Sequence, residues 1–368
     1  MEFASLQTVE KTPCPALSEI GKPVRPELSP PAPSCAPAAP RWCGAAAGAP
    51  GWHSGSAQDA DEHARLLTGW QQHYDQLSAG RFQGRLSEWR LPAMQVFREH
   101  TSQALHQRCR VWDDALWFGL PVLDQAAEAT RINGRPQTPH SLMLRPGGEA
   151  FELRTPAGQG LFGVVVQRSA LAEAAERQGC SLDWDGLARA ELWQLPAEAH
   201  LACLMTLHQW LPEDPAAGPR RPQHAQALQA MQDQLLGLLL DLLDAGQVEP
   251  EARQQAGRRQ QLVARARALI EARPDEPPGV AQLCEALHVS RRTLQYVFED
   301  QLGLSPLQAL RAQRLNGARR QLRQVAAQGL GVQDVAAHWG FWHLSQFGAD
   351  YRRLFGESPS ETLRGGAH

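Results

Sequence analysis

The sequence predicts a multidomain α+β protein: an N-terminal β-rich sandwich or small barrel with flanking helices, followed by an all-α domain of two helix-turn-helix units. Three observations predict this fold class. Short apolar runs punctuated by Gly, Pro and Asn follow one another from Phe82 to Gln167. Beyond Ser169 the apolar spacing becomes helical, and near the C-terminus one helical pattern is used twice. The chain has 368 residues and is 43% hydrophobic, which is enough for two or three domains with real cores.

Residues 1–57 are expected to form a disordered arm, because they contain ten prolines among Ala, Ser and Gly and few large apolar side chains. Their first part lacks the continuous apolar stretch of a signal peptide. The richest apolar run of the chain, residues 235–246, is broken by Asp241 and Asp244 and falls short of the roughly 20 residues that a membrane span needs. We therefore expect a cytoplasmic protein with no membrane segment.

The seven cysteines, at positions 14, 35, 43, 109, 180, 203 and 284, form no C-x-x-C pair and no metal-ligand spacing. Neither a zinc site nor a disulfide framework is indicated. A reducing compartment and a protein without a bound metal are the simplest interpretation.

A second domain is expected at residues 58–250, with strands from Phe82 to Gln167 and helices at about 169–179, 196–211 and 223–245. The last of these helices carries an apolar face made of Leu228, Met231, Leu235, Leu238, Leu239 and Leu242. This face either packs in the core of the same domain or pairs with a second copy in a homodimer, and apolar periodicity alone does not choose. Residues 249–261 are polar and are interpreted as a connector.

A helix with two different faces is predicted within residues 288–306, HVSRRTLQYVFEDQLGLSP. The side chains expected to be buried together are Leu294, Val297, Phe298 and Leu302. The opposite stripe consists of Arg292, Gln295, Tyr296 and Glu299. This short helix therefore presents a row of long hydrogen-bonding side chains to its surroundings.

The same pattern recurs at residues 332–359, VQDVAAHWGFWHLSQFGADYRRLFGESP. The apolar positions Val280, Leu283, Cys284 and Leu287 return 52 residues later as Val332, Val335, Ala336 and Trp339. Each copy is predicted to be a short helix, a tight turn and a second helix, at about 280–301 and 332–355. Ser290 is the expected N-cap of one second helix, and Gly340 supplies a turn residue in the other copy.

The charge is distributed unevenly along the chain. The predicted third domain, residues 258–368, holds fifteen Arg and ten Asp or Glu, an excess of five positive charges, whereas the rest of the chain has a net charge of −8. A basic C-terminal domain points to a polyanion partner. A single amphipathic helix of this kind is more often a solvated face. The duplication, the turn residues and the basic excess together favour double-stranded DNA, with each second helix in the major groove.

Residues 280–363 resemble the DNA-binding domain of the AraC/XylS family of bacterial transcription regulators. The residues that carry the resemblance are Leu283, Ser290, Leu294, Phe298, Gly303, Ser305, Pro306, Arg314, Leu315, Val335, Ala336, Gly340, Phe341, Ser345, Phe347, Phe355, Gly356, Ser358 and Pro359. The resemblance implies a long helix at about 306–323, an operator DNA and RNA polymerase as a partner. It implies base reading by Arg292, Gln295, Tyr296, His343, Ser345 and Gln346. Ser290 and Arg291 are expected at DNA phosphates.

A closer likeness, from about residue 67 to 364, is to the subgroup of that family that activates ethanolamine-utilisation operons. The stretches that carry it include "GWQQHYDQLSAGRFQGRLSEW", "RPGGEAFELRTPAG" and "GFWHLSQFGADYRRLF". This subgroup implies a response to ethanolamine together with adenosylcobalamin as co-effector, and control of ethanolamine catabolism genes. A regulator of another amine or carbon-source pathway would keep the same scaffold and is the alternative.

Candidate effector residues lie in the predicted strands and offer aromatic faces and carboxylates that suit a small ammonium ion. They are Trp89, Glu99, Trp112, Trp117, Phe118 and Glu152. The alternative is that this set is ordinary core. Four arginines, Arg98, Arg108, Arg110 and Arg145, would suit the periphery of a corrinoid or lie at the solvated surface.

Two other classes of function remain open. The first is that the sandwich is a cupin-type metalloenzyme tethered to DNA, but the H-x-H start of such sites is missing and no catalytic pattern is found, so no catalytic residue is assigned. A ligand-independent DNA binder, with the sandwich used for dimerisation, is the third reading. Stabilisation by an effector would separate a sensor from a scaffold.

Overall fold

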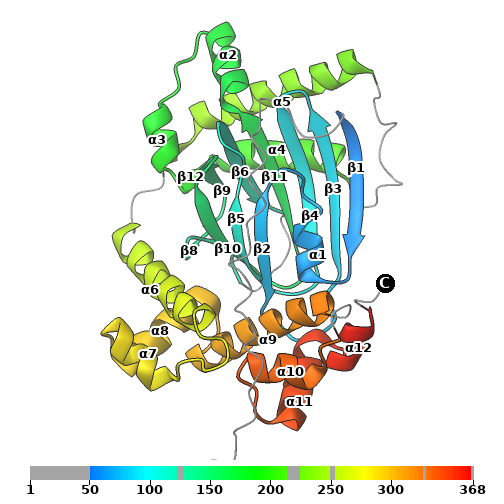
Figure 1. The fold of residues 1–368 in the computed structure, drawn as a ribbon. Coiled ribbons are helices and arrows are strands. Elements are labelled where there is room, and N and C mark those ends of the chain that lie inside the picture. Colours follow the sequence, from blue (N-terminus) through cyan, green and yellow to red (C-terminus); the bar gives the residue numbers. More distant parts are fainter. Residues whose placement is uncertain (1–49, 123–127, 214–223, 249–252, 326–328, 366–368) are drawn as a thin grey trace, which may run out of the picture. The chain divides into compact units, whose positions relative to one another are not determined.

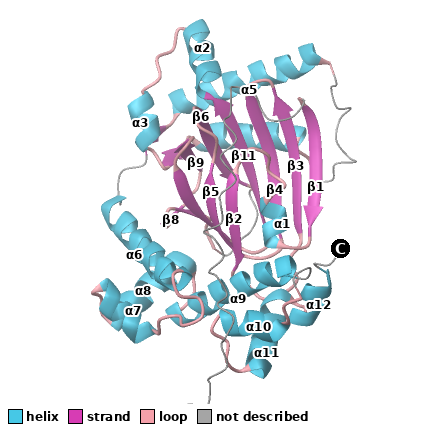
Figure 2. Ribbon diagram, viewed as in Figure 1, coloured by secondary structure: helices cyan, strands magenta, loops and turns pink. Residues whose placement is uncertain are grey.

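The computed structural model describes residues 50–122, 128–213, 224–248, 253–325 and 329–365 (Figures 1 and 2). Most of the expected N-terminal arm lies outside the described residues. Its last part does not match the expectation, because Gly51–Ala57 form strand β1, which pairs antiparallel with β3 (Gly84–Leu91). Trp52 packs edge-on against Trp89, with ring centroids 5.2 Å apart. Within the described residues, the β-rich region therefore includes residues 51–57, which were expected to belong to the arm.

Two antiparallel sheets make up the β-rich region, as the sequence predicted. The described strands of the larger sheet run in the order β1-β3-β4-β11-β6-β9-β12-β13. Besides β1 and β3 they are β4 (Met94–Thr101), β6 (Ala115–Pro121), β9 (Ser141–Pro146), β11 (Gln159–Gln167), β12 (Leu192–Gln194) and β13 (Gln247–Val248). The smaller sheet contains β2 (Gln71–Gln76), β5 (Leu105–Arg110), β10 (Ala150–Thr155), β7 (Arg131–Ile132) and β8 (Arg135–Pro136) in that order.

The two sheets pack face to face over one apolar core. Phe97 and Trp117 of the larger sheet meet Leu105 and Phe151 of the smaller sheet in this core, together with Ala60 of helix α1 (Ala60–Ala64). Because successive side chains of a strand point to opposite faces, the other face of the larger sheet needs a second cover. Helices supply it.

Helices α2 (Arg168–Gln178), α3 (Trp184–Arg189), α4 (Ala197–Trp210) and α5 (Ala225–Ala245) cover that outer face (Figure 1). The predicted apolar face of α5 lies in this core: Leu228, Leu235, Leu239 and Leu242 are buried, and Met231 and Leu238 pack against it. Of the two alternatives for this face, the structure shows packing within the same chain.

The helical domain begins earlier than expected, with α6 (Arg253–Glu271). The segment interpreted as a polar connector is therefore largely the start of a helix. Its apolar residues are concentrated in its second half, where Val263, Ala266 and Ile270 are buried. Apolar spacing that begins only at the tenth residue of the helix, Leu262, gives no signal for the turns before it.

Two helix-turn-helix units follow, at the positions the repeat predicted. The first consists of α7 (Val280–Leu287) and α8 (Arg291–Leu302), and the second of α10 (Val332–His338) and α11 (Leu344–Phe355). The long helix α9 (Pro306–Val325) joins them and α12 (Pro359–Gly365) follows.

Each unit has a core of its own. Phe298 and Leu294 of α8 pack with α6 and α7 in one cluster, whereas Phe347 and Tyr351 of α11 pack with α10 and the second half of α9 in another. The helical domain therefore consists of two small cores joined by α9.

We expect Phe298→Ala and Phe347→Ala each to lower the free energy of unfolding of a fragment spanning residues 253–368 by about 3–5 kcal/mol, because each ring is fully buried and leaves a cavity. Urea unfolding followed by circular dichroism measures the loss. The control is Leu307→Ala on α9, where the side chain is 58% exposed and a change within about 0.5 kcal/mol is expected. A loss below about 1 kcal/mol at either Phe would contradict the two-core description.

Candidate DNA-binding interface

The turn of the first unit is fixed by local geometry. His288 ends α7 in the left-handed region with φ 54°, and the Oγ of Ser290 accepts a hydrogen bond of 3.0 Å from the backbone N–H of Thr293. The N-cap prediction for Ser290 is confirmed. Because this hydroxyl holds the first turn of α8, the N-terminal end of that helix has a defined direction.

The second unit reaches the same geometry with a glycine. Gly340 has φ 69°, and a Cβ at this position would lie 2.7 Å from the Cδ of Pro277. The turn therefore requires glycine here, as the sequence predicted. His343 occupies the N-cap position of α11, and no side-chain cap bond is formed there.

Helix α8 has the two faces that the sequence predicted. Its apolar residues Leu294, Val297 and Phe298 are buried, whereas Arg291 and Arg292 are exposed. Among the described residues, neither guanidinium has an ion-pair partner within 4.0 Å. Both are therefore available to acceptors of a ligand, and a guanidinium matches the O6 and N7 acceptors of guanine.

The rest of the predicted row is partly engaged. Gln295 donates to the side chain of Glu299, and the ring of Tyr296 is 53% exposed. The guanidinium of Arg259, on α6, lies 5.0 Å from the centre of that ring and donates to Asp300 at 3.2 Å. Sequence reasoning missed Arg259, because its segment was interpreted as a connector. Its guanidinium lies beside the predicted reading face and is ion-paired with Asp300.

The second unit offers fewer hydrogen-bonding groups. His343, Ser345 and Gln346 are exposed at the start of α11, and Gln346 donates to Asp350 at 3.0 Å. Residues 53 positions after Arg292, Gln295 and Tyr296 are Ser345, Gly348 and Ala349. Small residues thus occupy two of these three places.

Apolar side chains are exposed at the start of α11 instead. Trp342 is 74% exposed and Leu344 is 42% exposed. Sequence reasoning missed both, because single apolar residues beside a turn look like core. Apolar groups of this kind contact thymine methyl groups in major grooves.

The six candidate effector residues do not form one site. Glu99 and Trp117 face the core between the sheets, with Trp112 packed against it, whereas Trp89 and Phe118 face the covering helices. Glu152 lies on the opposite face of the smaller sheet and approaches His106 at 3.4 Å. The reason is strand alternation: neighbours such as Trp117 and Phe118 must point to opposite faces.

Buried polar side chains lie beside Glu99 in the core between the sheets. The Nε2 of His63 lies 2.9 Å from its carboxylate, and burial followed by the charge of Glu99 raises the pKa of Tyr74 well above its usual value. Trp117 stacks on Phe151 at 4.8 Å nearby. His63 and Tyr74 lie outside the segment that suggested the sandwich, and so they were missed.

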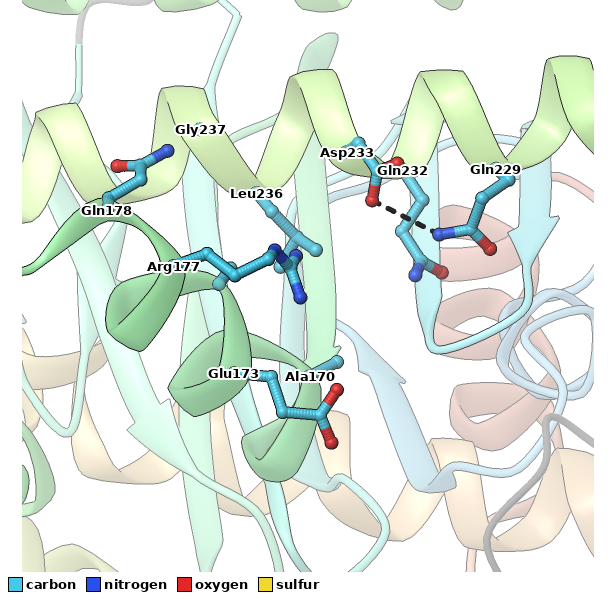
Figure 3. Close-up of a pocket in the computed structure, with 10 residues that line it drawn as sticks. Ala170, Glu173, Arg177, Gln178, Gln229, Gln232, Asp233, Leu236 and Gly237 are labelled. Atoms are coloured by element: carbon cyan, nitrogen blue, oxygen red, sulfur yellow. Dashed lines mark hydrogen bonds between the residues drawn. The ribbon is translucent and has the colours of Figure 1, made fainter.

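A groove of about 470 Å³ lies between α2 and α5 (Figure 3), and none of the six candidate residues lines it. Glu173 and Arg177 of α2 line one side of the groove. On the α5 side, Gln229 donates a hydrogen bond of 3.1 Å to Asp233. The charged side chains that line it are exposed. It is a polar surface groove, which contrasts with the apolar pockets that hold most small ligands.

In the part of the chain that the structure describes, no three His, Cys, Asp or Glu side chains are grouped so as to hold a metal ion. Of the helices described, none combines the length and the apolar character that crossing a bilayer requires.

Comparison with known proteins finds relatives of the two units. Residues 283–365 match the family model described as a helix-turn-helix domain. The probable thc operon regulatory protein of Rhodococcus erythropolis is 39% identical over 95 residues, which are 26% of this chain and 29% of that protein. The XylDLEGF operon transcriptional activator of Pseudomonas putida is 35% identical over 86 residues, 23% of this chain and 27% of that protein. The chain spans less than a third of the length of these curated relatives.

A solved structure of a transcriptional regulator with an AraC-type DNA-binding domain, from Chromobacterium violaceum, shares 29% identity. The match covers 30% of this chain and 95% of that chain, with a TM-score of 0.28. The family model and the curated relatives define the C-terminal domain as a DNA-binding helix-turn-helix domain. These matches fall in the part of the chain for which the AraC/XylS resemblance was predicted, and they agree with it.

We expect Arg292→Ala to relax the base preference at one operator position, at a cost of about 1–3 kcal/mol there, because a base-reading side chain discriminates one base pair. Arg291→Ala should weaken binding to all sequences alike, because a phosphate contact carries no sequence information. Selection of bound sequences from a random DNA pool, followed by affinity measurements, checks both. Equal and sequence-independent losses for the two variants would show that Arg292 does not read a base.

Proposed function

We propose that the chain is a transcriptional activator that binds an operator through α8 and α11 and responds to a small effector held by the β-rich region. The observation that carries the DNA-binding part is the duplicated helix-turn-helix unit with Arg291 and Arg292 exposed and unpaired among the described residues. The relatives named as operon regulators and activators support the transcriptional role. RNA polymerase as a partner, a homodimer and a cytoplasmic location are parts of the same proposal.

The proposed effector is ethanolamine, which is the amine that the subgroup resemblance implies. The group that best suits a primary ammonium ion is the buried carboxylate of Glu99, with the ring of Trp117 on the same side of the sheet. His63 now lies against that carboxylate, 2.9 Å away. A bound ammonium ion would compete with His63 for Glu99.

Adenosylcobalamin as co-effector is supported by the resemblance alone. All four arginines considered for it are engaged elsewhere: Arg98 lies 3.5 Å from Glu213, Arg108 3.2 Å from Glu271, Arg110 3.2 Å from Asp113 and Arg145 2.6 Å from Glu149. These pairs are spread over several elements, and the pair of Arg108 joins β5 to α6. The described residues therefore do not form an arginine cradle for a corrinoid.

We expect the affinity of the full chain for operator DNA to fall with salt, with a log-log slope of about 0.9 for each phosphate that is neutralised. Fluorescence anisotropy with a labelled duplex, at salt concentrations from about 50 to about 300 mM, measures this slope. Arg291→Ala should reduce the slope by about 1, whereas Asp113→Asn, at an exposed side chain on the β-rich region, should leave it unchanged. Binding that is indifferent to salt would contradict the DNA assignment.

We expect ethanolamine and adenosylcobalamin together to release or absorb heat with the full chain, and to raise its melting temperature, because a ligand that binds the folded state stabilises it. Glu99→Gln should abolish the ethanolamine response, since it removes the charge and keeps the shape. The matched control is Glu149→Gln, whose carboxylate is 57% exposed. No heat and no thermal shift with either compound, using protein that still binds its operator, would reject ethanolamine and leave the regulator proposal standing.

A further inference from the structure

The β-rich region forms hydrogen bonds to the C-terminal ends of α8 and α11, the second helices of the two units and here called the recognition helices. The backbone oxygen of Leu302, the last residue of α8, accepts a hydrogen bond of 2.8 Å from the Nε of Arg154 in β10. The backbone oxygen of Leu354, near the end of α11, accepts from the Nε2 of Gln76 at 2.6 Å and from the backbone N–H of Gly80 at 3.0 Å. Carbonyls in the last turn of a helix lack partners within the helix. Here the smaller sheet and the turn after β2 supply them for both helices.

One buried carboxylate joins the two units between these contacts. Asp75 of β2 is 1% exposed and is bound by Arg267 of α6 and by Arg320 of α9, the latter at 2.9 Å. Arg267 belongs to the helix that packs in the core of the first unit, whereas Arg320 belongs to the part of α9 that packs in the core of the second. A single side chain of the β-rich region therefore holds one cation from each unit.

A second carboxylate reinforces the hold on the second unit. Asp59, also buried, accepts from the Nε of Arg319 at 2.5 Å, and Arg323 lies 3.5 Å away. Arg319 in turn donates to the hydroxyl of Tyr351 in α11 at 3.4 Å. Through Arg319, Asp59 is linked to the second recognition helix itself.

Both carboxylates are charged in this arrangement. Burial alone would raise the pKa of Asp75, but the positive charges of Arg320 and Arg267 outweigh it and hold that pKa well below its usual value. The pKa of Asp59 is lowered as well, since the charge and hydrogen bond of Arg319 outweigh the effect of burial. The interface therefore consists of charge-assisted hydrogen bonds, whose strength depends closely on geometry.

We propose that Asp75, Arg154 and Gln76 are positioning residues for DNA recognition, which fix the separation and angle of α8 and α11. This inference rests on the proposed function, in which both helices enter the major groove. One base pair inserted between the two recognised segments moves them by about 3.4 Å and rotates them by about 35°. Helices that are held rigidly cannot follow that change, whereas helices joined by α9 alone can adjust.

The same strand connects this interface to the core between the sheets. Tyr74 points into that core, where its neighbour is Glu99, and the next residue, Asp75, points out to Arg267 and Arg320. The backbone oxygen of Tyr74 also accepts from Arg320 at 3.4 Å. A displacement of β2 by a ligand at Glu99 would move Asp75 with it.

The test measures spacing preference with the full chain. A DNA site selected by the wild-type protein is compared with versions in which one base pair is inserted or removed between the two recognised segments. We expect the wild type to lose at least about tenfold in affinity on such a change, equivalent to about 1.4 kcal/mol. Asp75→Ala should lose about threefold or less. Asp75→Glu, which keeps the charge, should restore most of the wild-type preference, and Asp113→Ala should match the wild type.

Arg154→Met tests the positioning role at the end of α8 alone. It keeps the proposal testable if the Asp75→Ala protein does not fold. It should relax the spacing preference by about half as much on a logarithmic scale, because α11 remains held. Melting curves of each variant establish that it is folded. Unchanged spacing preference in folded Asp75→Ala and Arg154→Met proteins, or an equal loss of affinity at every spacing, would overturn the positioning role. A wild type that binds DNA at all spacings alike would overturn it too, whereas a wild type that binds no DNA would overturn the proposed function.

Discussion

The smaller sheet has one apolar face and one charged face, and the arrangement of the rest of the chain depends on this alternation. In β2, β5 and β10 the residues Tyr74, Leu105 and Phe151 turn inward to the core between the sheets. Their neighbours Asp75, His106 and Glu152 turn outward. The inward set closes the sandwich, and the outward set meets the arginines of α6 and α9. A shift of β2 by one residue would exchange the two sets and destroy both contacts at once.

The outward face is also ordered internally. Arg267 donates to the Nδ1 of His106, which leaves the proton of the ring on Nε2, 3.4 Å from Glu152. Burial, and then the charge of Arg267, lower the pKa of His106, so the neutral ring with this tautomer is favoured. For Glu152, burial would raise the pKa, but the hydrogen bond from His106 and the charges of Arg267 and Arg108 outweigh it and lower the pKa. Arg267 thus contacts both His106 of β5 and Asp75 of β2.

What the sequence could predict was local. The two faces of α8 and the turn at Gly340 follow from spacing and residue type over a few positions, and the structure has both. To predict whether the six effector candidates lie together, the face of the sheet on which each side chain lies must be known. A continuous apolar run such as ALWFGLP does not reveal that face. The ion pairs of Asp75 join residues separated by up to 245 positions, and single charged residues in a polar helix give no hint of such a partner. The start of α6 was missed because its first half has no apolar face.

The charged character of the interface bears on what it can do. An apolar interface between the β-rich region and the helical domain would gain free energy from area and would tolerate sliding, since the hydrophobic effect has no direction. Buried ion pairs contribute less net free energy than apolar groups of the same size, because both charges lose their hydration. Their contribution is present only when donor and acceptor are aligned, as Arg267 and Arg320 are around Asp75. Such an interface is suited to fixing an orientation rather than to permanent adhesion. A ligand that moved β2 by a small distance would then change the geometry of the two recognition helices at a modest cost in free energy.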